Sequence, residues 1–313
     1  MILSPTADAV IAGLFGLLVG SFLNVVIHRL PRMLERSWWL SAGETLGDAA
    51  SYQRVFGRPA PALLEAAHVQ LASDAQTLGP YSLARPRSRC GRCGHGIRWY
   101  ENLPVLSYVF LRGRCSACRA PIGLRYPLVE LATGALFALC AWRWGISLQG
   151  VAWAGFASIL VVQFAIDLDT QLLPDDLNYP LLWLGLLAAA IGWSGVPLAS
   201  AVWGAALGYL ALWSVYHLYR LATGKEGMGY GDFKLLAALG AWFGAEYLLA
   251  IVLVSSLVGA VLGGGLLLAG RLAHKDIPIA FGPFLAGAGL VCLAVGPAEV
   301  RALAPFAFPF FAG

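Results

Sequence analysis

Long apolar runs separated by short polar connections make up most of this chain. Eight runs have the length and apolar character of membrane helices. They cover residues 9–27, 127–145, 148–167, 178–195, 199–221, 233–243, 247–270 and 281–297. The pattern predicts an all-α polytopic membrane protein with about eight transmembrane helices.

Two of these runs need separate comment. The run 233–243 is too short to cross about 30 Å of hydrocarbon alone. We expect it to tilt, to extend back into the glycine-rich turn 227–231, or to be shielded by neighbouring helices, with Gly244 separating it from the next run. The first run is not expected to be a cleaved signal, because the preceding residues MILSPTAD carry no basic region.

Composition agrees with a membrane protein and adds one soluble segment. Hydrophobic residues make up 59% of the 313 residues and charged residues 12%, with a mean hydropathy of +0.71. Residues 28–125 hold 14 basic against 6 acidic side chains. We therefore divide the chain into a first transmembrane helix (1–27), a basic loop (28–125) with one short helix expected at 61–78, and a seven-helix membrane domain (126–313).

The distribution of lysine and arginine predicts the orientation. With the amino terminus outside, the segments 28–125, 168–177, 220–234 and 271–275 are cytoplasmic and hold 19 of the 21 basic residues. Basic residues concentrate on the cytoplasmic side of membrane proteins. Both termini are then expected outside the cytoplasm, with the basic loop inside.

Four of the six cysteines form a regular pattern within the basic loop. Cys90 and Cys93 are separated by two residues, as are Cys115 and Cys118. Two such pairs are typical of a tetrahedral structural zinc site without an open coordination position. Two disulfides or four free thiols are the alternatives, and a cytoplasmic location argues against disulfides. His95 could replace one ligand, although a surface role is expected; Cys140 and Cys292 are expected to be core residues.

Two carboxylates lie against apolar runs. Asp232 follows the glycine-rich turn 227–231, and Asp167 closes the run 148–167 beside Asp169, Asp175 and Asp176. Ionisable groups at that depth are functional candidates, whereas the alternative is an anchor at the membrane surface. Two adjacent carboxylates share one proton, so that one can activate water while the other polarises a scissile carbonyl. The pattern alone does not separate Asp167 from Asp169.

Several ordered motifs carry a family resemblance. They are GSFLNVVIHRLP (20–31), PRSRCGRC (86–93), WYENLPVLSY (99–108), LRGRCSAC (111–118), RYPLVEL (125–131), IDLDTQLLPD (166–175), GMGYGDFKL (227–235) and FGPFLA (281–286). With them the chain resembles type IV prepilin leader peptidases, which are integral-membrane aspartic proteases and N-methyltransferases. The resemblance implies that Asp167, the first aspartate of D-x5-L-P-D, and Asp232, in G-x-G-D, form the proteolytic pair.

The resemblance also implies substrate, cofactors and location. Substrates would be prepilins or type II secretion pseudopilins, cut at the cytoplasmic face of the bacterial inner membrane and then methylated with S-adenosylmethionine. Lipid is the other expected partner, and nucleic acid is not expected. The pattern assigns no residues to the methyl donor, and Glu130 and Lys234 are candidates for supporting roles. Residues 49–81 match no motif, and the first knuckle lacks a proline found in many members.

Two functions from other classes remain open from the sequence. A transporter could use Asp167 and Asp232 as a proton relay. A membrane scaffold that is held together by zinc and has no catalytic activity is the other possibility, but it would not explain why two carboxylates lie at the energetically unfavourable edge of the membrane. Asn24, which is polar near the end of the first run, is expected to face other helices and form a hydrogen bond there, with substrate contact as the alternative.

Overall fold

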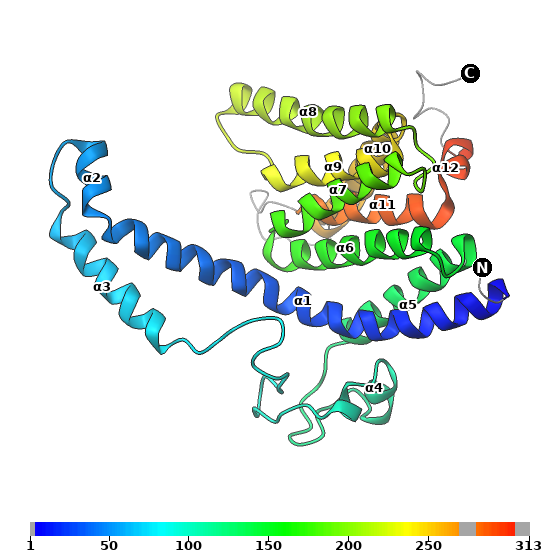
Figure 1. The fold of residues 1–313 in the computed structure, drawn as a ribbon, viewed down its shortest axis with the longest axis horizontal. Coiled ribbons are helices and arrows are strands. Elements are labelled where there is room, and N and C mark those ends of the chain that lie inside the picture. The colour runs from blue at the N-terminus through cyan, green and yellow to red at the C-terminus, as the bar shows by residue number, and fades with distance from the viewer. Residues whose placement is uncertain (1–3, 269–279, 304–313) are drawn as a thin grey trace.

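The computed structural model describes residues 4–268 and 280–303, and this part of the chain is helical apart from loops and two isolated β-bridges (Figure 1). The longer helices are α1 (Pro5–Gly47), α2 (Ala49–Phe56), α3 (Ala62–Thr77), α5 (Arg125–Trp144), α6 (Leu148–Thr170), α7 (Asp175–Ala190), α8 (Leu198–Thr223), α9 (Tyr230–Phe243), α10 (Leu248–Leu268) and α11 (Gly282–Val295). Short elements are η1 (Trp99–Asn102), α4 (Leu106–Phe110), η2 (Ala245–Tyr247) and α12 (Pro297–Leu303).

The predicted membrane segments coincide with helices α1 and α5 to α11. Among the described residues, four helical stretches are long and apolar enough to cross a bilayer by themselves: Pro5–Gly47, Leu148–Thr170, Leu198–Thr223 and Ala245–Gly265. Helix α11 is apolar but shorter. The all-helical, multi-pass membrane fold is therefore confirmed. The predicted loop 271–275 lies outside the described residues.

The first helix is longer than expected. It does not end near residue 27 but continues to Gly47 with Pro31 inside it, and Figure 1 shows its second half extending beyond the bundle. The helix predicted at 61–78 is present as α3 and packs back on α1, where the His68 ring lies 2.8 Å from the Gly43 carbonyl oxygen. The first half of the basic loop is thus a helical arm.

Helix α9 lies in the centre of the bundle. Nearly all its residues from Asp232 to Phe243 are buried, and the Trp242 indole N–H donates to the Leu181 carbonyl of α7 at 2.9 Å. A Cβ on Gly204 of α8 would lie 2.2 Å from the Gly240 carbonyl oxygen, so glycine permits the close approach of α8 and α9. The expectation that this short segment is shielded by neighbours is confirmed.

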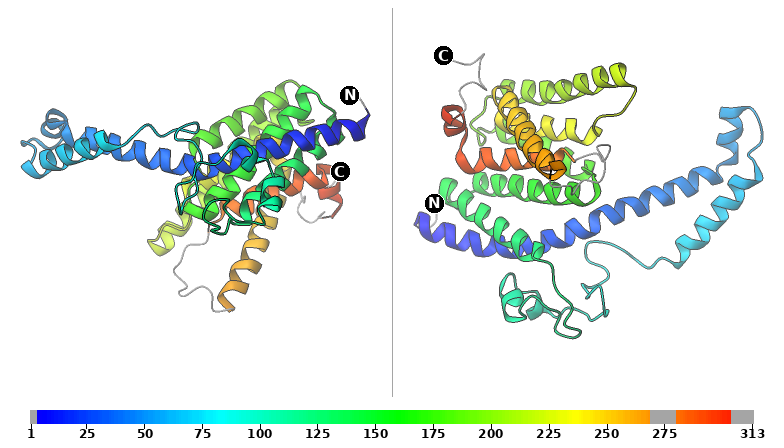
Figure 2. Two further views of the ribbon diagram at one scale, coloured as in Figure 1. Left: turned by 90° about the horizontal axis from the view of Figure 1, so that it is seen from below. Right: turned by 180° about the vertical axis from the view of Figure 1, so that it is seen from behind.

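The helix ends that carry the two predicted catalytic aspartates lie at the same end of the bundle. Helix α6 ends there, whereas α9 and α11 begin there, and α1 extends outward from the same end (Figure 1). Helix α10 leans away from the bundle (Figure 2). Antiparallel neighbours thus bring residues far apart in sequence to one end.

Candidate active site and metal centre

The two predicted catalytic aspartates are both buried at this end of the bundle. Asp167 lies in the last turn of α6 with 4% exposure, and Asp232 lies in the first turn of α9 with 7% exposure. Helix α6 ends at Thr170, three residues after Asp167, and Gln171 takes a left-handed conformation as the C-cap. The carboxylates are near enough to interact electrostatically.

A third helix and one leucine complete the surroundings of the pair. The backbone N–H of Gly282, which opens α11, donates to the Asp167 carboxylate. Leu173 packs between Gly282 and Gly231. A Cβ atom added to Gly282 would lie 2.8 Å from Cδ1 of Leu173, and one added to Gly231 would lie 2.7 Å from Cβ of Leu173. Neither glycine could carry a side chain here without displacing Leu173. The pattern of apolar runs had not singled out Gly282.

The remaining aspartates of the cluster lie in different environments. Asp169 is exposed and pairs with Arg125, whose guanidinium also donates to the Ala165 carbonyl at 2.9 Å. Asp175 accepts from Lys234 at 2.7 Å through both carboxylate oxygens. Asp176 is exposed. Burial therefore separates Asp167 from Asp169, a distinction that the sequence pattern did not provide.

A buried amide pair supports the loop that carries Leu173. The Gln163 side chain donates to the Asn178 amide oxygen at 2.7 Å, and Asn178 donates to the Leu173 carbonyl at 3.3 Å. Both side chains are essentially inaccessible to water, where hydrogen-bonded polar groups specify one arrangement. Sequence reasoning missed this pair, although a glutamine inside an apolar run was the available signal.

Asn24 of α1 joins that helix to α5, and Glu130 of α5 joins the membrane helices to the basic loop. Asn24 is buried and donates to the Tyr126 carbonyl at 3.1 Å, as expected for a residue facing other helices. The buried Glu130 carboxylate accepts the Val105 N–H at 2.8 Å and the Ser21 hydroxyl. Val105 has a φ of 58°, which is costly for a β-branched residue. Glu130 thus supports a strained turn at the start of α4.

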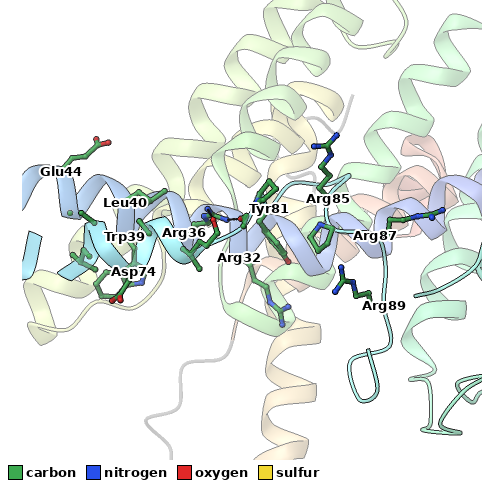
Figure 3. A pocket seen from close by; sticks show the side chains of 18 of the residues that line it. Arg32, Arg36, Trp39, Leu40, Glu44, Asp74, Tyr81, Arg85, Arg87 and Arg89 are labelled. Carbon is green, nitrogen blue, oxygen red and sulfur yellow. Dashed lines mark hydrogen bonds between the residues drawn. The ribbon is translucent and has the colours of Figure 1, made fainter. Parts of the chain in front are cut away.

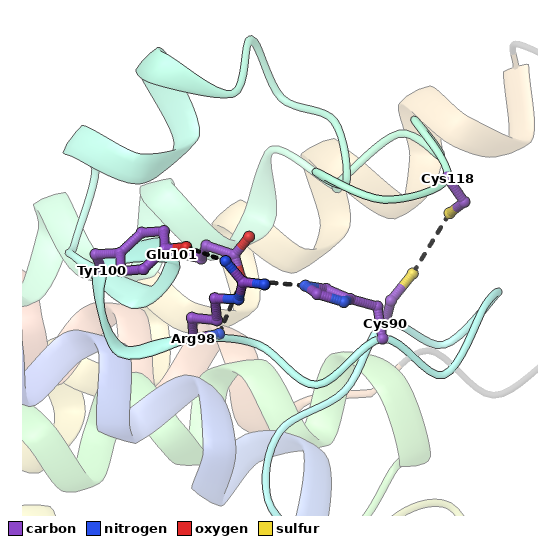
Figure 4. Close-up of polar contacts among 6 residues, drawn as sticks. Cys90, Arg98, Tyr100, Glu101 and Cys118 are labelled. Atoms are coloured by element: carbon purple, nitrogen blue, oxygen red, sulfur yellow. Dashed lines mark hydrogen bonds and ion pairs between the residues drawn. The ribbon is translucent and has the colours of Figure 1, made fainter.

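The four predicted metal ligands converge on one point. Their Sγ atoms all lie within 4.8 Å of one another, and the Sγ atoms of Cys90 and Cys118 are 3.8 Å apart (Figure 4). Tetrahedral zinc with Zn–S bonds of about 2.3 Å requires S···S distances of about 3.8 Å. A disulfide, at about 2.05 Å, is far shorter. The cluster could therefore hold a metal ion, and its donor set fits zinc.

Both knuckles use the same turn. The N–H of Gly94 donates to the Cys90 carbonyl and the N–H of Arg119 to the Cys115 carbonyl, and both donors have a left-handed φ, 72° and 57° respectively. Left-handed backbone after the second cysteine lets the chain fold back over the metal position. The turns place the two thiols of each knuckle on the same side.

The thiols also influence one another electrostatically. Hydrogen bonds from the backbone N–H groups of Cys93 and Arg92 lower the pKa of the Cys90 thiol to about 6, which favours the thiolate that binds metal. The backbone N–H of His95 would lower the pKa of Cys93, but the thiols of Cys118 and Cys90 raise it to about 11. Such crowding of thiols is relieved when a cation binds among them.

His95 is engaged away from the four sulfurs. Its ring lies 3.3 Å from the Glu101 carboxylate. The Ser116 hydroxyl and the Arg98 N–H donate to Glu101 and lower its pKa to about 2. Glu101 therefore connects the two knuckles. Cys140 and Cys292 are buried among apolar residues, as predicted.

Paired carboxylates inside a helical membrane bundle are the arrangement of an intramembrane aspartic peptidase. Two family profiles match: the bacterial peptidase A24 N-terminal domain over residues 14–144 and the type IV leader peptidase family over residues 154–264. The chain belongs to the type IV leader peptidase family.

Similar proteins cover nearly the whole chain. A prepilin leader peptidase/N-methyltransferase of Pseudomonas aeruginosa is 48% identical over 303 residues, which are 97% of this chain and 96% of the relative. One of Stutzerimonas stutzeri is 50% identical over 94% of this chain and 92% of the relative, and one of Aeromonas salmonicida is 48% identical over 92% and 91%. No solved structure matches.

Proposed function

We propose that this protein removes the leader peptide from prepilins or pseudopilins and then methylates the new amino terminus. Identity of 48–50% to prepilin leader peptidase/N-methyltransferases over almost the whole length supports both activities. The chain is accordingly a prepilin peptidase and an N-methyltransferase. A proton-coupled transporter and a scaffold without chemistry are not supported by these relatives.

Asp167 and Asp232 carry out the hydrolysis in this proposal. The ionised carboxylate takes a proton from water as its oxygen attacks the scissile carbonyl, while the protonated carboxylate donates to the carbonyl oxygen. The resulting tetrahedral species collapses as the leaving amine takes up a proton. The observation that carries the proposal is the burial of these two aspartates together, whereas Asp169 and Asp175 are exposed and neutralised by Arg125 and Lys234.

The membrane arrangement is proposed from the charge distribution. Helices α1 and α5 to α11 give eight crossings of the bacterial inner membrane, with both termini in the periplasm and the aspartates at the cytoplasmic face. The arginines of the α1 extension and the knuckles support this orientation. A leader peptide retained in the cytoplasm would then reach the pair without crossing the bilayer.

The four cysteines hold one structural zinc ion in this proposal. Four protein ligands close the coordination sphere, so the ion would hold the two knuckles together and take no part in hydrolysis. Zinc would neutralise part of the thiolate charge that Cys90, Cys93, Cys115 and Cys118 concentrate within 4.8 Å.

The peptidase assignment is tested with three single asparagine variants of the purified protein. Asp167→Asn and Asp232→Asn should each abolish cleavage of a synthetic prepilin, measured by mass, and the double variant should be no worse because the two act as a unit. Asp169→Asn is the matched control and should retain most activity. Normal cleavage by either buried-aspartate variant would remove that residue from the pair.

The same variants separate the two activities. Neither aspartate is needed to move a methyl group, so Asp167→Asn should still methylate a pilin supplied already cleaved. Loss of methylation by a correctly folded Asp167→Asn protein would mean that the two sites overlap.

A further inference from the structure

The short helix α4 presents an apolar face that no described part of the chain covers. Leu106, Val109 and Phe110 form this face, and they are 56%, 64% and 82% exposed. Residues spaced by three and four positions lie on the same side of a helix. Trp99 of η1, which packs beside α4, is also exposed. Exposed apolar side chains gathered in this way mark an interaction surface.

The start of α4 is fixed at the depth of the membrane helices. The Val105 N–H donates to the Glu130 carboxylate at 2.8 Å, and the Ser21 hydroxyl donates to the same carboxylate. Ser21 precedes the predicted end of the first span, at residue 27, by six positions, which is about 9 Å along the helix. Phe22 and Leu131, the neighbours of Ser21 and Glu130, are exposed and face lipid in a multi-pass membrane protein. Helix α4 therefore begins at a level where neighbouring side chains contact lipid.

The loop before the first knuckle is held where α1 leaves the predicted span. Arg29 is buried, and its guanidinium donates to the carbonyls of Ser82, Leu83 and Pro86 at 2.8, 3.2 and 2.7 Å. Arg29 lies two positions beyond residue 27, about 3 Å along the helix. The headgroup layer extends about 5–7 Å beyond the hydrocarbon on each side of a bilayer. The segment 82–86 is therefore at the level of the lipid headgroups.

Exposed arginines surround this anchored segment. In the described part of the chain, none of them forms an ion pair with a carboxylate. Figure 3 shows the two acidic residues of the same groove, Glu44 and Asp74, at the opposite end from the arginines of the loop. Positive charge is thus concentrated at the end of the groove nearest the span. The arginines are Arg32 of α1 and Arg85, Arg87 and Arg89 of the loop.

We propose that the basic loop docks on the anionic surface of the membrane, with the apolar face of α4 inserted among acyl chains and these arginines bound to lipid phosphates. The inference rests on the membrane arrangement proposed above and on neither catalytic activity. Apolar and aromatic side chains inserted roughly 5–10 Å, with arginine at the headgroups, are typical of segments that lie in a membrane interface. Guanidinium groups bind phosphate through paired hydrogen bonds. Both parts of the surface therefore fit one occupant, an anionic phospholipid layer.

The position of α4 favours lipid over the substrate as this occupant. Helices α1 and α5 pack on α6. Figures 1 and 2 show α4 on the side of the α1–α5 pair that faces away from α9. A pilin helix lying against Asp167 and Asp232 would be separated from α4 by these two helices. The apolar face of α4 is instead continuous in level with the lipid-facing side of α1 and α5.

The cysteine module determines how the inserted segment is presented. Both η1 and α4 lie between Cys93 and Cys115 in the sequence. A metal ion held by the two knuckles would fix both ends of this segment at one point. Docking would in turn hold the module against the bilayer, close to where α1 and α5 enter it.

Photo-crosslinking of the full-length protein in lipid nanodiscs tests the insertion. Phe110 is replaced by the photoreactive residue p-benzoyl-phenylalanine, and adducts are identified by intact mass. The matched control is the same replacement at Phe56, an exposed phenylalanine of α2 at the far end of the helical arm (Figure 1). Phospholipid adducts should be about tenfold or more abundant at Phe110, because a side chain at interfacial depth contacts acyl chains. Resistance of residues 85–125 to proteolysis reports the folding of the module.

Paired arginine variants in the photoreactive Phe110 protein test the phosphate contacts. In nanodiscs that contain phosphatidylglycerol, Arg85→Gln/Arg87→Gln should lower the yield of lipid adducts by about fivefold or more, since each arginine near an anionic surface strengthens binding by about that factor. Arg54→Gln/Arg58→Gln removes the same charge at the far end of the arm and should leave the yield unchanged. Equal yields from the two double variants would overturn the assignment of the arginines to lipid phosphate.

The remaining outcomes separate this inference from the proposed function. Equal lipid adducts at Phe110 and Phe56 in a protein that cleaves and methylates would overturn the docking and leave the function standing. Lipid adducts at Phe110 in a protein that does neither would support the docking and contradict the function. If prepilin added to the nanodiscs is crosslinked at Phe110 in place of lipid, the apolar face of α4 is a substrate surface and the inference is wrong.

Discussion

Gly282 lies so close to Asp167 that a Cβ built on the glycine would be 2.5 Å from the carboxylate Oδ2. Real side chains do not approach an oxygen so closely, and the backbone N–H of the same glycine donates to that carboxylate. The first residue of α11 therefore fixes the position of Asp167 from the side opposite its own helix. A methyl group at this position must move either the carboxylate or α11.

Gly282→Ala should consequently reduce prepilin cleavage by roughly a hundredfold, the scale that displacement of a catalytic group by about 1 Å produces. Gly287→Ala is the control on the same helix, because a Cβ there would meet only the edge of Phe164 at 4.0 Å. Two assays are run on both variants: the rate of prepilin cleavage and the methylation of pre-cleaved pilin. Methylation by Gly282→Ala should be retained, which would show that this variant is folded. Equal cleavage by the two variants would exclude this role for Gly282.

The metal content of the protein provides a second prediction. Purified protein should contain about one zinc ion per chain, since four thiolates make one closed tetrahedral site. Cys115→Ser should lower the zinc content and speed proteolysis between Arg85 and Arg125, because the knuckles then separate. Cys292→Ala, which removes a buried thiol of the bundle, should leave the zinc content unchanged. Undiminished loop protection in a metal-free preparation would exclude the site.

The repeated knuckle turn predicts an asymmetry between Gly94 and Arg119. Both residues are left-handed, but only the arginine bears a Cβ, which costs roughly 1–2 kcal/mol in that conformation. Arg119→Gly should therefore stabilise the module by up to about 1 kcal/mol after the added flexibility of glycine is included. Gly94→Ala should destabilise it by a similar amount. Denaturant-induced zinc release measures both, and a less stable Arg119→Gly protein would contradict the prediction.

Glu101 should make the module sensitive to acid. Its pKa of about 2 is below the ordinary value of 4.5, so its ionised form is stabilised on folding. This contribution is complete above pH 4.5 and is lost as the pH falls from 4.5 through about 2. Glu101→Gln should thus lower the resistance of residues 85–125 to proteolysis at pH 7.

A pH series of both proteins checks the sign of this effect. The difference in unfolding free energy between wild type and Glu101→Gln should narrow as the pH falls from 4.5 toward 2, using an acid-active protease as the probe. A difference independent of pH would show that Glu101 acts through shape rather than charge.

The membrane helices were predictable because lipid requires continuous apolar runs with satisfied backbone hydrogen bonds. The run 148–167 became α6 at Leu148–Thr170, and Gly244 does separate α9 from the next segment, with a φ of 84°. The convergence of the four cysteines followed from their spacing, because a metal site needs all four thiols at one point.

The helical arm was not predictable in the same way. Residues 28–47 carry both charged and apolar side chains on exposed faces, and Trp38 and Trp39 are 53% and 66% exposed, so no single apolar stripe marks the helix. Pro31 lies inside α1, although proline inside a helix normally kinks or breaks it. The contact of Gly282 with Asp167 joins residues that are 115 positions apart in the sequence. Local sequence patterns do not predict contacts at such a separation.

The shortness of α9 has a consequence for the supply of water. Its 14 residues measure about 21 Å at about 1.5 Å per residue, whereas a hydrocarbon core is about 30 Å thick. Helix α9 is therefore shorter than the hydrocarbon core is thick, either at the end of the helix that carries Asp232 or at the opposite end, where Gly244 stops the helix. Before Asp232 the chain is the exposed turn from Gly224 to Gly227, with Lys225 and Glu226 in it. If the turn before Asp232 lies at the membrane surface as proposed, a polar turn in place of further helix would let the bilayer thin locally, and solvent would then reach the level of a buried carboxylate without a permanent channel through the bundle.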